Sequence, residues 1–261
     1  MILEERRSRI LRIAEESGFV SLQRLITEVG ASESTIRRDL EYLDASGQIQ
    51  RTRGGAVYAG DSLTDFDSRR DCASFQKRQI ARRTASLIQP GETVLLDGGT
   101  TTLEVARHLA GKALQVVTNS LPIASLLMNS SDVELIFIGG YVYPRTGVAL
   151  GDQAVEALRS IHVNRLVMST GGITQEGLFN SNALLVETER QMIRVADRVM
   201  LVADSSKFGQ RALSHLCPLD AVHEIVTDDG ISPDWRNAMQ AAGLELDVVS
   251  ASQPAAAGSP P

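Results

Sequence analysis

Short apolar segments alternate with helix-length segments along residues 92–250, and this alternation constrains the fold more than any other feature. Each short segment has the length of a strand that is buried on both faces. Strands joined by helical crossovers lie parallel in one sheet, with helices covering its faces. The pattern therefore predicts an α/β fold with a Rossmann-like, mostly parallel sheet. The expected strands span residues 93–96, 114–117, 134–138, 165–168, 199–202, 224–227 and 244–249.

The length of 261 residues leaves room for a smaller domain in front of this sheet. We expect a head at residues 1–58, a linker at 59–75, the sheet domain at 76–250 and a disordered tail at 251–261. No apolar run reaches the roughly 18 residues of a membrane span, and the first residues are too acidic for a secretory signal. A cytoplasmic protein is expected.

The net charge of −6 argues at first against a nucleic-acid partner, but its distribution does not. Residues 1–58 contain nine arginines and nine acidic residues, so the head is formally neutral and the excess acid lies in the rest of the chain. Phosphate contacts are local, so a neutral head can bind DNA when its arginines share one face.

The head shows three helical segments, at residues 4–17, 21–29 and 32–43. In the third, Ile36, Leu40 and Leu43 have the spacing of a core-facing stripe, and Ser32 can cap the first turn. This arrangement turns other side chains of the first two turns outward, where a recognition helix meets the major groove. These are Ser34, Thr35, Arg37 and Arg38.

Residues 48–57 alternate in polarity and predict a β-hairpin after the third helix. Gly54 and Gly55 are expected to supply the positive φ angles of a tight turn. Arg51 and Arg53 are two residues apart on one strand and would point the same way, toward phosphates or the minor groove. The hairpin therefore has the character of a DNA-binding wing.

The run TIRRDLEYLDASGQIQRTRGGA closely resembles the winged helix-turn-helix of the DeoR family of bacterial transcription regulators. The resemblance rests on the Thr-Ile-Arg-Arg-Asp-Leu helix and on the Gly-Gly-Ala at the end of the wing. It implies that this head binds a double-stranded DNA operator. The DNA contacts that it implies are Ser34, Thr35, Arg37 and Arg38 from the helix, and Arg51 and Arg53 from the wing.

Polar and glycine-rich loops follow the expected strands of the larger domain. They lie at residues 97–102, 118–120, 139–140, 171–172 and 204–209. The carboxyl ends of parallel strands share one edge of a sheet, and ligands bind there. The first loop combines glycines, hydroxyl groups and a helix start, which suits a phosphate. It has neither the Walker nor the dinucleotide spacing.

The order DGGTTT, VVTNS, IGG, GGI and ADSSKFG resembles the DeoR C-terminal sensor domain across nearly all of residues 76–250. That domain is similar to ribose-5-phosphate isomerase and the CoA transferases, and its family members respond to phosphorylated sugars or related metabolites. Glu189 is an alternative to Glu187, because the pattern does not show which one turns inward. The effector ligands that the resemblance implies are Asp97, Gly98, Gly99, Thr100, Thr101, Thr102, Asn119, Glu187 and Lys207.

These features together predict a DNA-binding regulator, a repressor of carbohydrate genes whose operator affinity changes when a phosphorylated sugar binds. Such proteins bind repeated half-sites as symmetric oligomers, so a homodimer or homotetramer is expected. An isomerase or CoA-transferase-like enzyme is the alternative, with Asp97, Glu187 and Lys207 as acid, base and electrostatic stabiliser. It would have no use for a recognition helix and wing, and we expect no catalytic residue. No metal or cofactor is expected, because the four histidines show no ligand spacing.

Overall fold

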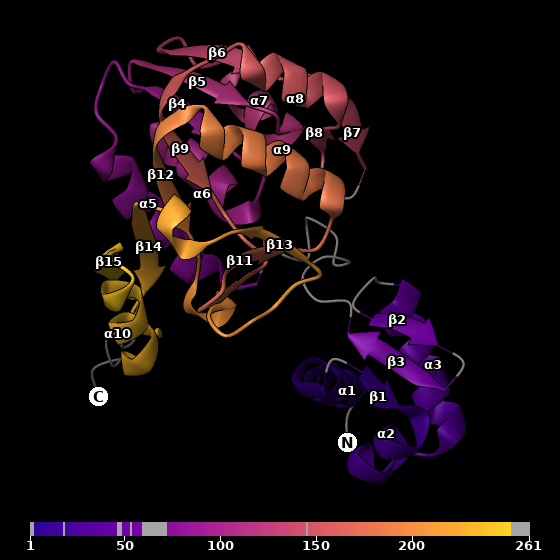
Figure 1. Cartoon of the computed structure of the whole chain (residues 1–261). Coiled ribbons are helices and arrows are strands. Elements are labelled where there is room, and N and C mark those ends of the chain that lie inside the picture. Colours follow the sequence, from indigo (N-terminus) through magenta and orange to yellow (C-terminus); the bar gives the residue numbers. More distant parts are fainter. Residues whose placement is uncertain are drawn as a thin grey trace, which may run out of the picture. The chain divides into compact units, whose positions relative to one another are not determined.

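The structure is a computed structural model, and it describes residues 3–17, 19–45, 49–52, 54–58, 72–144 and 146–251. The chain divides into two compact units, residues 1–69 and 70–261, each with its own hydrophobic core (Figure 1). Arg53, residues 59–71 of the expected linker and the expected tail from residue 252 lie outside the described residues.

Within its described residues, the head contains three helices and a three-stranded antiparallel sheet in the order β1-β3-β2. Its core is formed by the apolar residues whose spacing predicted the three helices, among them Ile10, Leu25, Ile36 and Leu43, all of which are buried. The expected helices and hairpin are therefore present. The elements are α1 (Leu3–Ser17), β1 (Phe19–Ser21), α2 (Leu22–Val29), α3 (Glu33–Ala45), β2 (Ile49–Thr52) and β3 (Gly55–Tyr58).

Strand β1 was not expected from the sequence. Its pairing gives a different reason for the glycine at position 55. β1 pairs with β3, with Ser21 opposite Gly55. Gly55 does not adopt a positive φ, contrary to the expectation for the hairpin turn. A β-carbon at Gly55 would instead lie 2.1 Å from the carbonyl oxygen of Val20. Glycine is required here because two strands approach closely, and a three-residue strand is too short to show a polarity pattern.

The larger unit is built on a seven-stranded parallel sheet in the order β15-β14-β12-β9-β4-β5-β6. Its strands include all of those that the sequence predicted. They are β4 (Thr93–Leu96), β5 (Leu114–Thr118), β6 (Val133–Phe137), β9 (Val163–Met168), β12 (Ala196–Val202), β14 (Glu224–Asp228) and β15 (Glu245–Val249). The fold class is confirmed as α/β with a Rossmann-like, mostly parallel sheet.

Helices connect these strands and cover the sheet, as buried parallel strands require. Helix α5 packs against α6, and α8 packs against α9, the latter pair lying in front of the sheet in Figure 1. None of the helices in the described ranges is both long enough and apolar enough to cross a membrane. The helices are α5 (Ser74–Leu87), α6 (Thr100–Leu109), α7 (Leu121–Leu127), α8 (Asp152–Arg159), α9 (Ala183–Arg194) and α10 (Pro233–Ala241).

The strand order places a topological switch point between β4 and β9. The chain starts in the middle of the sheet at β4, runs outward to β6, and then returns to β9 on the other side of β4. Helices leave neighbouring strands in opposite directions at such a point, which opens a crevice at the carboxyl edge of the sheet. The loops after β4 and β9 therefore flank the position where an open α/β sheet binds ligands.

Two small sheets add to this core and were not expected from the sequence. The hairpin of β7 (Tyr141–Tyr143) and β8 (Val148–Leu150) follows β6. An antiparallel sheet joins β10 (Gly172–Thr174), β11 (Gly177–Asn180) and β13 (Ser214–Cys217). These strands are short, and each lies between elements of the main sheet, where the alternation of strands and helices does not reveal it. Helix α9 begins at Ala183, where the side chain of Asn182 caps its first turn.

Candidate functional site

The first two turns of α3 present polar side chains away from the head core. Ser32 caps the helix, because its Oγ accepts a hydrogen bond from the backbone N–H of Thr35 at 3.3 Å. Ser34, Arg37 and Arg38 are exposed and Thr35 is partly exposed. The helix therefore has the orientation that the sequence predicted, with a polar face available to a nucleic acid.

A buried carboxylate fixes α3 against α1. Asp39 is 1% exposed and accepts hydrogen bonds from Nε of Arg6 (2.6 Å) and Nε of Arg7 (3.1 Å). The bond to Asp39 raises the pKa of Arg6 above its ordinary value. The guanidinium of Arg7 also lies 3.6 Å from the centre of the Tyr42 ring. Asp39 follows Arg38 directly, so the ion pair sets the orientation of the exposed arginines.

Two of the predicted DNA contacts, Arg37 and Arg51, form ion pairs with acidic side chains of α3. Arg37 pairs with Glu33 at 2.7 Å, and Arg51 of the wing pairs with Glu41 at 3.2 Å. The carboxylate of Asp44 also accepts a hydrogen bond from the backbone N–H of Arg51 at 3.0 Å, which fixes the wing to α3. Exposed ion pairs contribute little stability, so phosphates can replace these acids as partners at small cost.

The loop after β4 lies at the switch point and depends on two glycines. A β-carbon at Gly98 would lie 2.0 Å from Cγ1 of Val148, and one at Gly99 would lie 2.3 Å from Oγ of Ser169. Gly98 has no room for a side chain, and a side chain at Gly99 would require the hydroxyl of Ser169 to turn away. Ser169 follows β9, so the loop packs against the strand on the other side of the crevice. Backbone amides in a loop without β-carbons are accessible to an anion.

Helix α6 begins directly after this loop. Thr100, Thr101 and Thr102 form its first turn and are buried. The hydroxyl of Thr102 donates to the carbonyl oxygen of Gly99 at 3.0 Å, which fixes the start of the helix. The first amides of a helix have no partner within it, and the helix dipole favours negative charge there. The arrangement suits a phosphate group.

Asn119 follows β5 and is completely buried. Its side-chain Nδ2 donates to the backbone carbonyl oxygen of Ala149 in β8 at 2.9 Å. Its backbone carbonyl oxygen accepts a hydrogen bond from the backbone N–H of Ala149 at 2.8 Å. Its Oδ1 has no hydrogen-bond partner within the described part of the chain. A buried acceptor of this kind is costly unless something donates to it, and a ligand hydroxyl would do so.

Lys207 lies in a short turn after β12, the strand next to β9. Asp204 accepts hydrogen bonds from the backbone N–H and the hydroxyl of Ser206, the former at 3.2 Å. Asp228 accepts from the N–H (2.7 Å) and the hydroxyl (2.8 Å) of Ser205. Two carboxylates thus hold the turn that carries Lys207 at the carboxyl edge of the sheet.

Of the two glutamates that the sequence left as alternatives, only one is buried. Glu187 is exposed on α9, whereas Glu189 is 1% exposed. The Nδ2 of Asn180 donates to both carboxylate oxygens of Glu189, at 2.7 and 2.9 Å. Burial, and then the charge of Asp97, raise the pKa of Glu189 well above its ordinary value, although the bond from Asn180 opposes this. Two carboxyl groups therefore interact beside the loop after β4.

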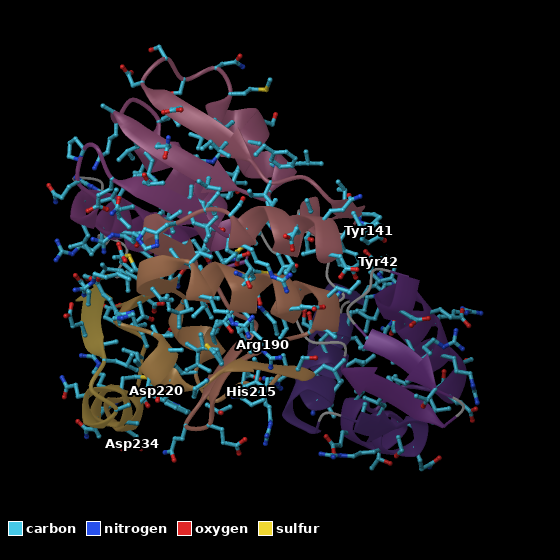
Figure 2. The ribbon with its side chains drawn as sticks, turned by 45° about the horizontal axis from the view of Figure 1, so that its top comes forward. Tyr42, Tyr141, Arg190, His215, Asp220 and Asp234 are labelled. Carbon is cyan, nitrogen blue, oxygen red and sulfur yellow. The ribbon has the colours of Figure 1, made fainter. Side chains whose placement is uncertain are left out.

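Arg190 fixes the helix that carries Glu189. It donates from Nε to the carbonyl oxygen of Leu216 (2.9 Å) and from Nη2 to that of His215 (2.7 Å), both in β13 (Figure 2). Cys217 follows in the same strand. Burial, and then the charge of Glu189, raise the pKa of Cys217 to about 12, so this thiol keeps its proton at neutral pH. The surroundings of Glu189 are thus rigid and of low polarity.

The raised pKa of Glu189 predicts a pH-dependent stability. An unfolded glutamate loses its proton near pH 4.5, whereas folded Glu189 keeps it to higher pH. Glu189 therefore lowers the free energy of unfolding as pH rises, by about 1.4 kcal/mol per pH unit within this window. Glu189→Gln cannot ionise, so in urea titrations it should gain stability relative to the wild type as pH rises. Glu187→Gln is the exposed control, and identical pH profiles of the two variants would contradict the assignment.

Three residues that contact the switch-point residues carry no local sequence signal, namely Ser169, Asn180 and Val148. Their roles come from tertiary contacts between separate loops, which no local pattern shows. Glu189 had a usable signal, because it lies three residues after Val186 and three before Met192, which are both buried. That helical spacing turns Glu189, and not Glu187, toward the core.

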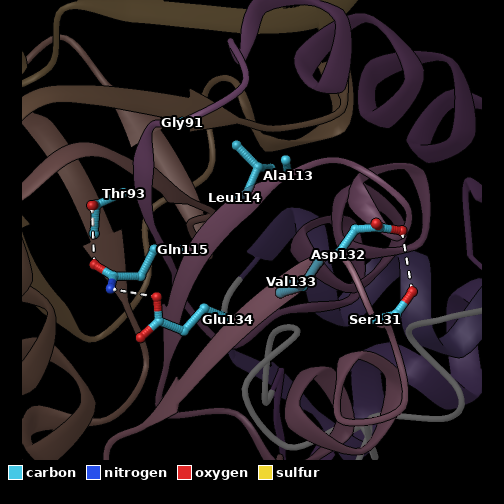
Figure 3. A pocket seen from close by; sticks show the side chains of 9 residues that line it. All are labelled: Gly91, Thr93, Ala113, Leu114, Gln115, Ser131, Asp132, Val133 and Glu134. Atoms are coloured by element: carbon cyan, nitrogen blue, oxygen red, sulfur yellow. Dashed lines mark hydrogen bonds between the residues drawn. The ribbon is translucent and has the colours of Figure 1, made fainter.

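A separate hollow of about 560 Å³ lies at the opposite edge of the sheet, where β4, β5 and β6 begin. Side chains of Thr93, Gln115 and Glu134 form a hydrogen-bonded row across it (Figure 3). Its lining holds the acids Asp132 and Glu134 and no basic residue, which does not suit a phosphate. No group of three or more His, Cys, Asp or Glu side chains with the arrangement of a metal site occurs among the described residues.

Comparison with known families decides the identity of both units. The DeoR-like helix-turn-helix domain matches residues 6–61, and the DeoR C terminal sensor domain matches residues 73–229. The chain belongs to the DeoR family of transcriptional regulators. Its head is therefore the DNA-binding unit of a DeoR regulator, and its larger unit is the sensor for a small-molecule effector.

Other DeoR-type regulators match nearly the whole chain. A protein of Escherichia coli O157:H7 with the provisional name aga operon transcriptional repressor is 34% identical over 253 residues, covering 94% of this chain and 93% of its own. YulB of Bacillus subtilis strain 168, an HTH-type transcriptional regulator, is 30% identical over 97% of this chain and 99% of its own length. UlaR of Escherichia coli strain K12 / DH10B is 28% identical and covers 93% and 97%.

Two solved structures show a weak likeness to this DeoR-family chain. Ribose 5-phosphate isomerase A from Methanocaldococcus jannaschii is 16% identical, with a TM-score of 0.37 over 51% of this chain and 53% of its own. The translation initiation factor eIF-2B of Pyrococcus horikoshii OT3 is also 16% identical, with a TM-score of 0.43 over 85% and 86%. TM-scores below 0.5 support no inference about function.

Proposed function

We propose that this regulator represses carbohydrate genes and releases its operator when a phosphorylated sugar binds at the carboxyl edge of the sensor sheet. The observation that carries the proposal is the loop from Asp97 to Thr102 at the switch point. It combines a glycine whose position has no room for a side chain, buried hydroxyl groups and a helix start, all at the switch point. This set of groups fits a phosphate and the hydroxyl groups attached to it.

On the DNA side, we propose that the polar face of α3 enters the major groove and that the wing contacts the backbone. The exposure of Ser34, Arg37 and Arg38, together with the fixed orientation of α3, supports this assignment. The proposed contacts remain Ser34, Thr35, Arg37, Arg38, Arg51 and Arg53, the last by resemblance alone.

On the effector side, we propose that the phosphate binds at Gly98–Thr102 with Lys207 as its cation, and that sugar hydroxyls meet Asp97, Asn119 and Glu189. The free Oδ1 of Asn119 supports a hydroxyl donor from the ligand. Glu189 takes the place that the resemblance gave to Glu187, because only Glu189 is buried beside Asp97.

The experiment that tests both sides begins with selection of DNA duplexes by the full-length protein from a random pool. We expect an enriched sequence with two related half-sites, because the family head reads base edges as part of a symmetric oligomer. A thermal-shift screen of sugar phosphates should then identify a ligand that lowers affinity for the selected duplex. Failure to enrich any sequence would contradict the operator proposal, and a ligand that leaves DNA affinity unchanged would contradict the sensor proposal.

Lys207→Ala should weaken binding of the sugar phosphate found in that screen while leaving operator affinity unchanged. A hydrogen bond to a charged group contributes about 1.5–3 kcal/mol, so we expect roughly a 10- to 100-fold rise in the dissociation constant. Isothermal titration calorimetry measures the effect. Lys207→Arg keeps the charge and should retain most of the affinity, and equal affinities for Lys207→Ala and the wild type would remove Lys207 from the site.

An isomerase-like activity is the second candidate, and one observation favours it. Asp97 and Glu189 are interacting carboxyl groups, and environments that separate two pKa values are typical of an acid and base pair. The relatives are named transcriptional regulators, so we expect the bound sugar phosphate to be recovered unchanged after long incubation. Conversion that is lost in Glu189→Gln would establish the enzymatic reading instead.

A further inference from the structure

The β7–β8 hairpin has one covered edge and one open edge. On the β8 side, Val148 bridges to Ser120, and the backbone N–H of Leu121 donates to the carbonyl oxygen of Gly147 at 2.8 Å. On the other side, β7 pairs with no strand besides β8 among the described residues. The backbone groups on the outer edge of β7 are therefore available to another strand.

The open edge is apolar and uncharged. Strand β7 has the sequence Tyr141-Val142-Tyr143, with Tyr141 57% and Val142 38% exposed (Figure 2). Proteins normally protect an edge strand with lysine, proline or inward charges, and β7 itself carries none of these. An edge strand without such protection can instead be covered by a strand that pairs with it.

The hairpin is held rigidly, which suits a binding edge. All three residues of β8 are buried, and the side chain and backbone of Asn119 both bond to Ala149. Val148 also packs against Gly98. A two-stranded ribbon alone is marginally stable in water, but these bonds attach β8 to the main sheet domain. Little order has to be gained when β7 pairs, which favours association.

We propose that β7 pairs with β7 of a second copy of this chain, antiparallel and across a two-fold axis at Val142. Antiparallel pairing about this axis sets Val142 opposite Val142 and each Tyr141 opposite a Tyr143. A two-fold contact brings identical surfaces together, which charged side chains would oppose. An uncharged edge in a chain of net charge −6 meets that condition. The contact would join two hairpins into one four-stranded sheet.

Cysteine cross-linking tests the register of this contact in the full-length protein. The background variant is Cys72→Ser, which removes the exposed native thiol and leaves the buried Cys217. Val142→Cys should give a covalent dimer on mild oxidation, because directly opposed Cα atoms are about 4.5–5.5 Å apart, within disulfide range. Tyr141→Cys alone should not, because its own copy lies diagonally, but a mixture of Tyr141→Cys and Tyr143→Cys proteins should cross-link.

Light scattering after size exclusion gives an independent measurement without cysteines. Val142→Lys adds a like charge on each side of the axis and should reduce the mass of the wild-type oligomer by half, whereas Val142→Thr keeps the β-branched shape and should not. Thermal unfolding of both variants checks that they are folded. A monomeric wild type, an unchanged mass for folded Val142→Lys, or a dimer in which Val142→Cys does not cross-link would each overturn the proposal. None of these outcomes depends on DNA or effector binding, so the proposed function is tested separately.

Discussion

Arg38→Ala is expected to abolish selective DNA binding while the protein remains folded. Arg38 is exposed on the first turns of α3 and forms no ion pair within the ranges that the structure describes. Its charge is therefore available to DNA without displacing an acidic partner, whereas Arg37 must exchange Glu33 for a phosphate. An arginine that contacts a base or phosphate contributes about 1–3 kcal/mol, or roughly 10- to 100-fold in affinity for each half-site. A symmetric oligomer loses this twice.

Fluorescence anisotropy with the duplex selected by the wild-type protein measures the loss. Repeating the titration at several salt concentrations separates two roles. A phosphate contact reduces the slope of log affinity against log salt, whereas a base contact reduces the preference for the selected sequence over a scrambled one. Arg159→Ala is the control, because Arg159 is an exposed arginine of the sensor unit paired with Glu156. Wild-type affinity in Arg38→Ala would mean that α3 does not read the operator.

At the switch point, the local sequence predicts the position of the loop but not the contacts that the loop makes. Strand ends are visible in sequence because buried strands are apolar and the loops after them are polar, so the loop around Gly98 was found directly. The reason for that glycine was not visible, since it is Val148, fifty residues further along the chain. The hairpin containing Val148 is built from strands of three residues. Such strands are stabilised by tertiary hydrogen bonds that local pattern does not record.

In the head, too, residue spacing predicts the orientation of a helix but not its contacts with other helices. The spacing of Ile36, Leu40 and Leu43 was sufficient to orient α3, because a helix turns by a fixed angle per residue. The spacing gave no indication that Asp39 would be buried, because an acidic residue next to an outward-facing arginine is usually exposed. Its burial depends on two arginines of α1, more than thirty residues earlier in the sequence.

Asp39→Ala is expected to unfold the head while the sensor unit stays folded. The carboxylate is 1% exposed and balances two guanidinium groups, whose side chains are 17% and 21% exposed. Its removal leaves the part-buried Arg6 and Arg7 side by side without a counter-charge. It also breaks both hydrogen bonds that join α1 to α3 and leaves a cavity between them, and a small domain has little stability to spare. DNA binding should be lost as a consequence.

Hydrogen exchange on the full-length protein measures this effect for each unit separately. Amides of α1 and α3 should exchange much faster in Asp39→Ala, whereas those of the parallel sheet should be unchanged. Glu33→Gln is the matched control on the same helix. It breaks the pair with Arg37. The two side chains are 51% and 57% exposed, and an exposed ion pair contributes less than about 1 kcal/mol to the free energy of unfolding. Unchanged protection of α1 and α3 in Asp39→Ala would show that apolar packing alone holds the recognition helix, so that Arg38 would not depend on this ion pair for its orientation.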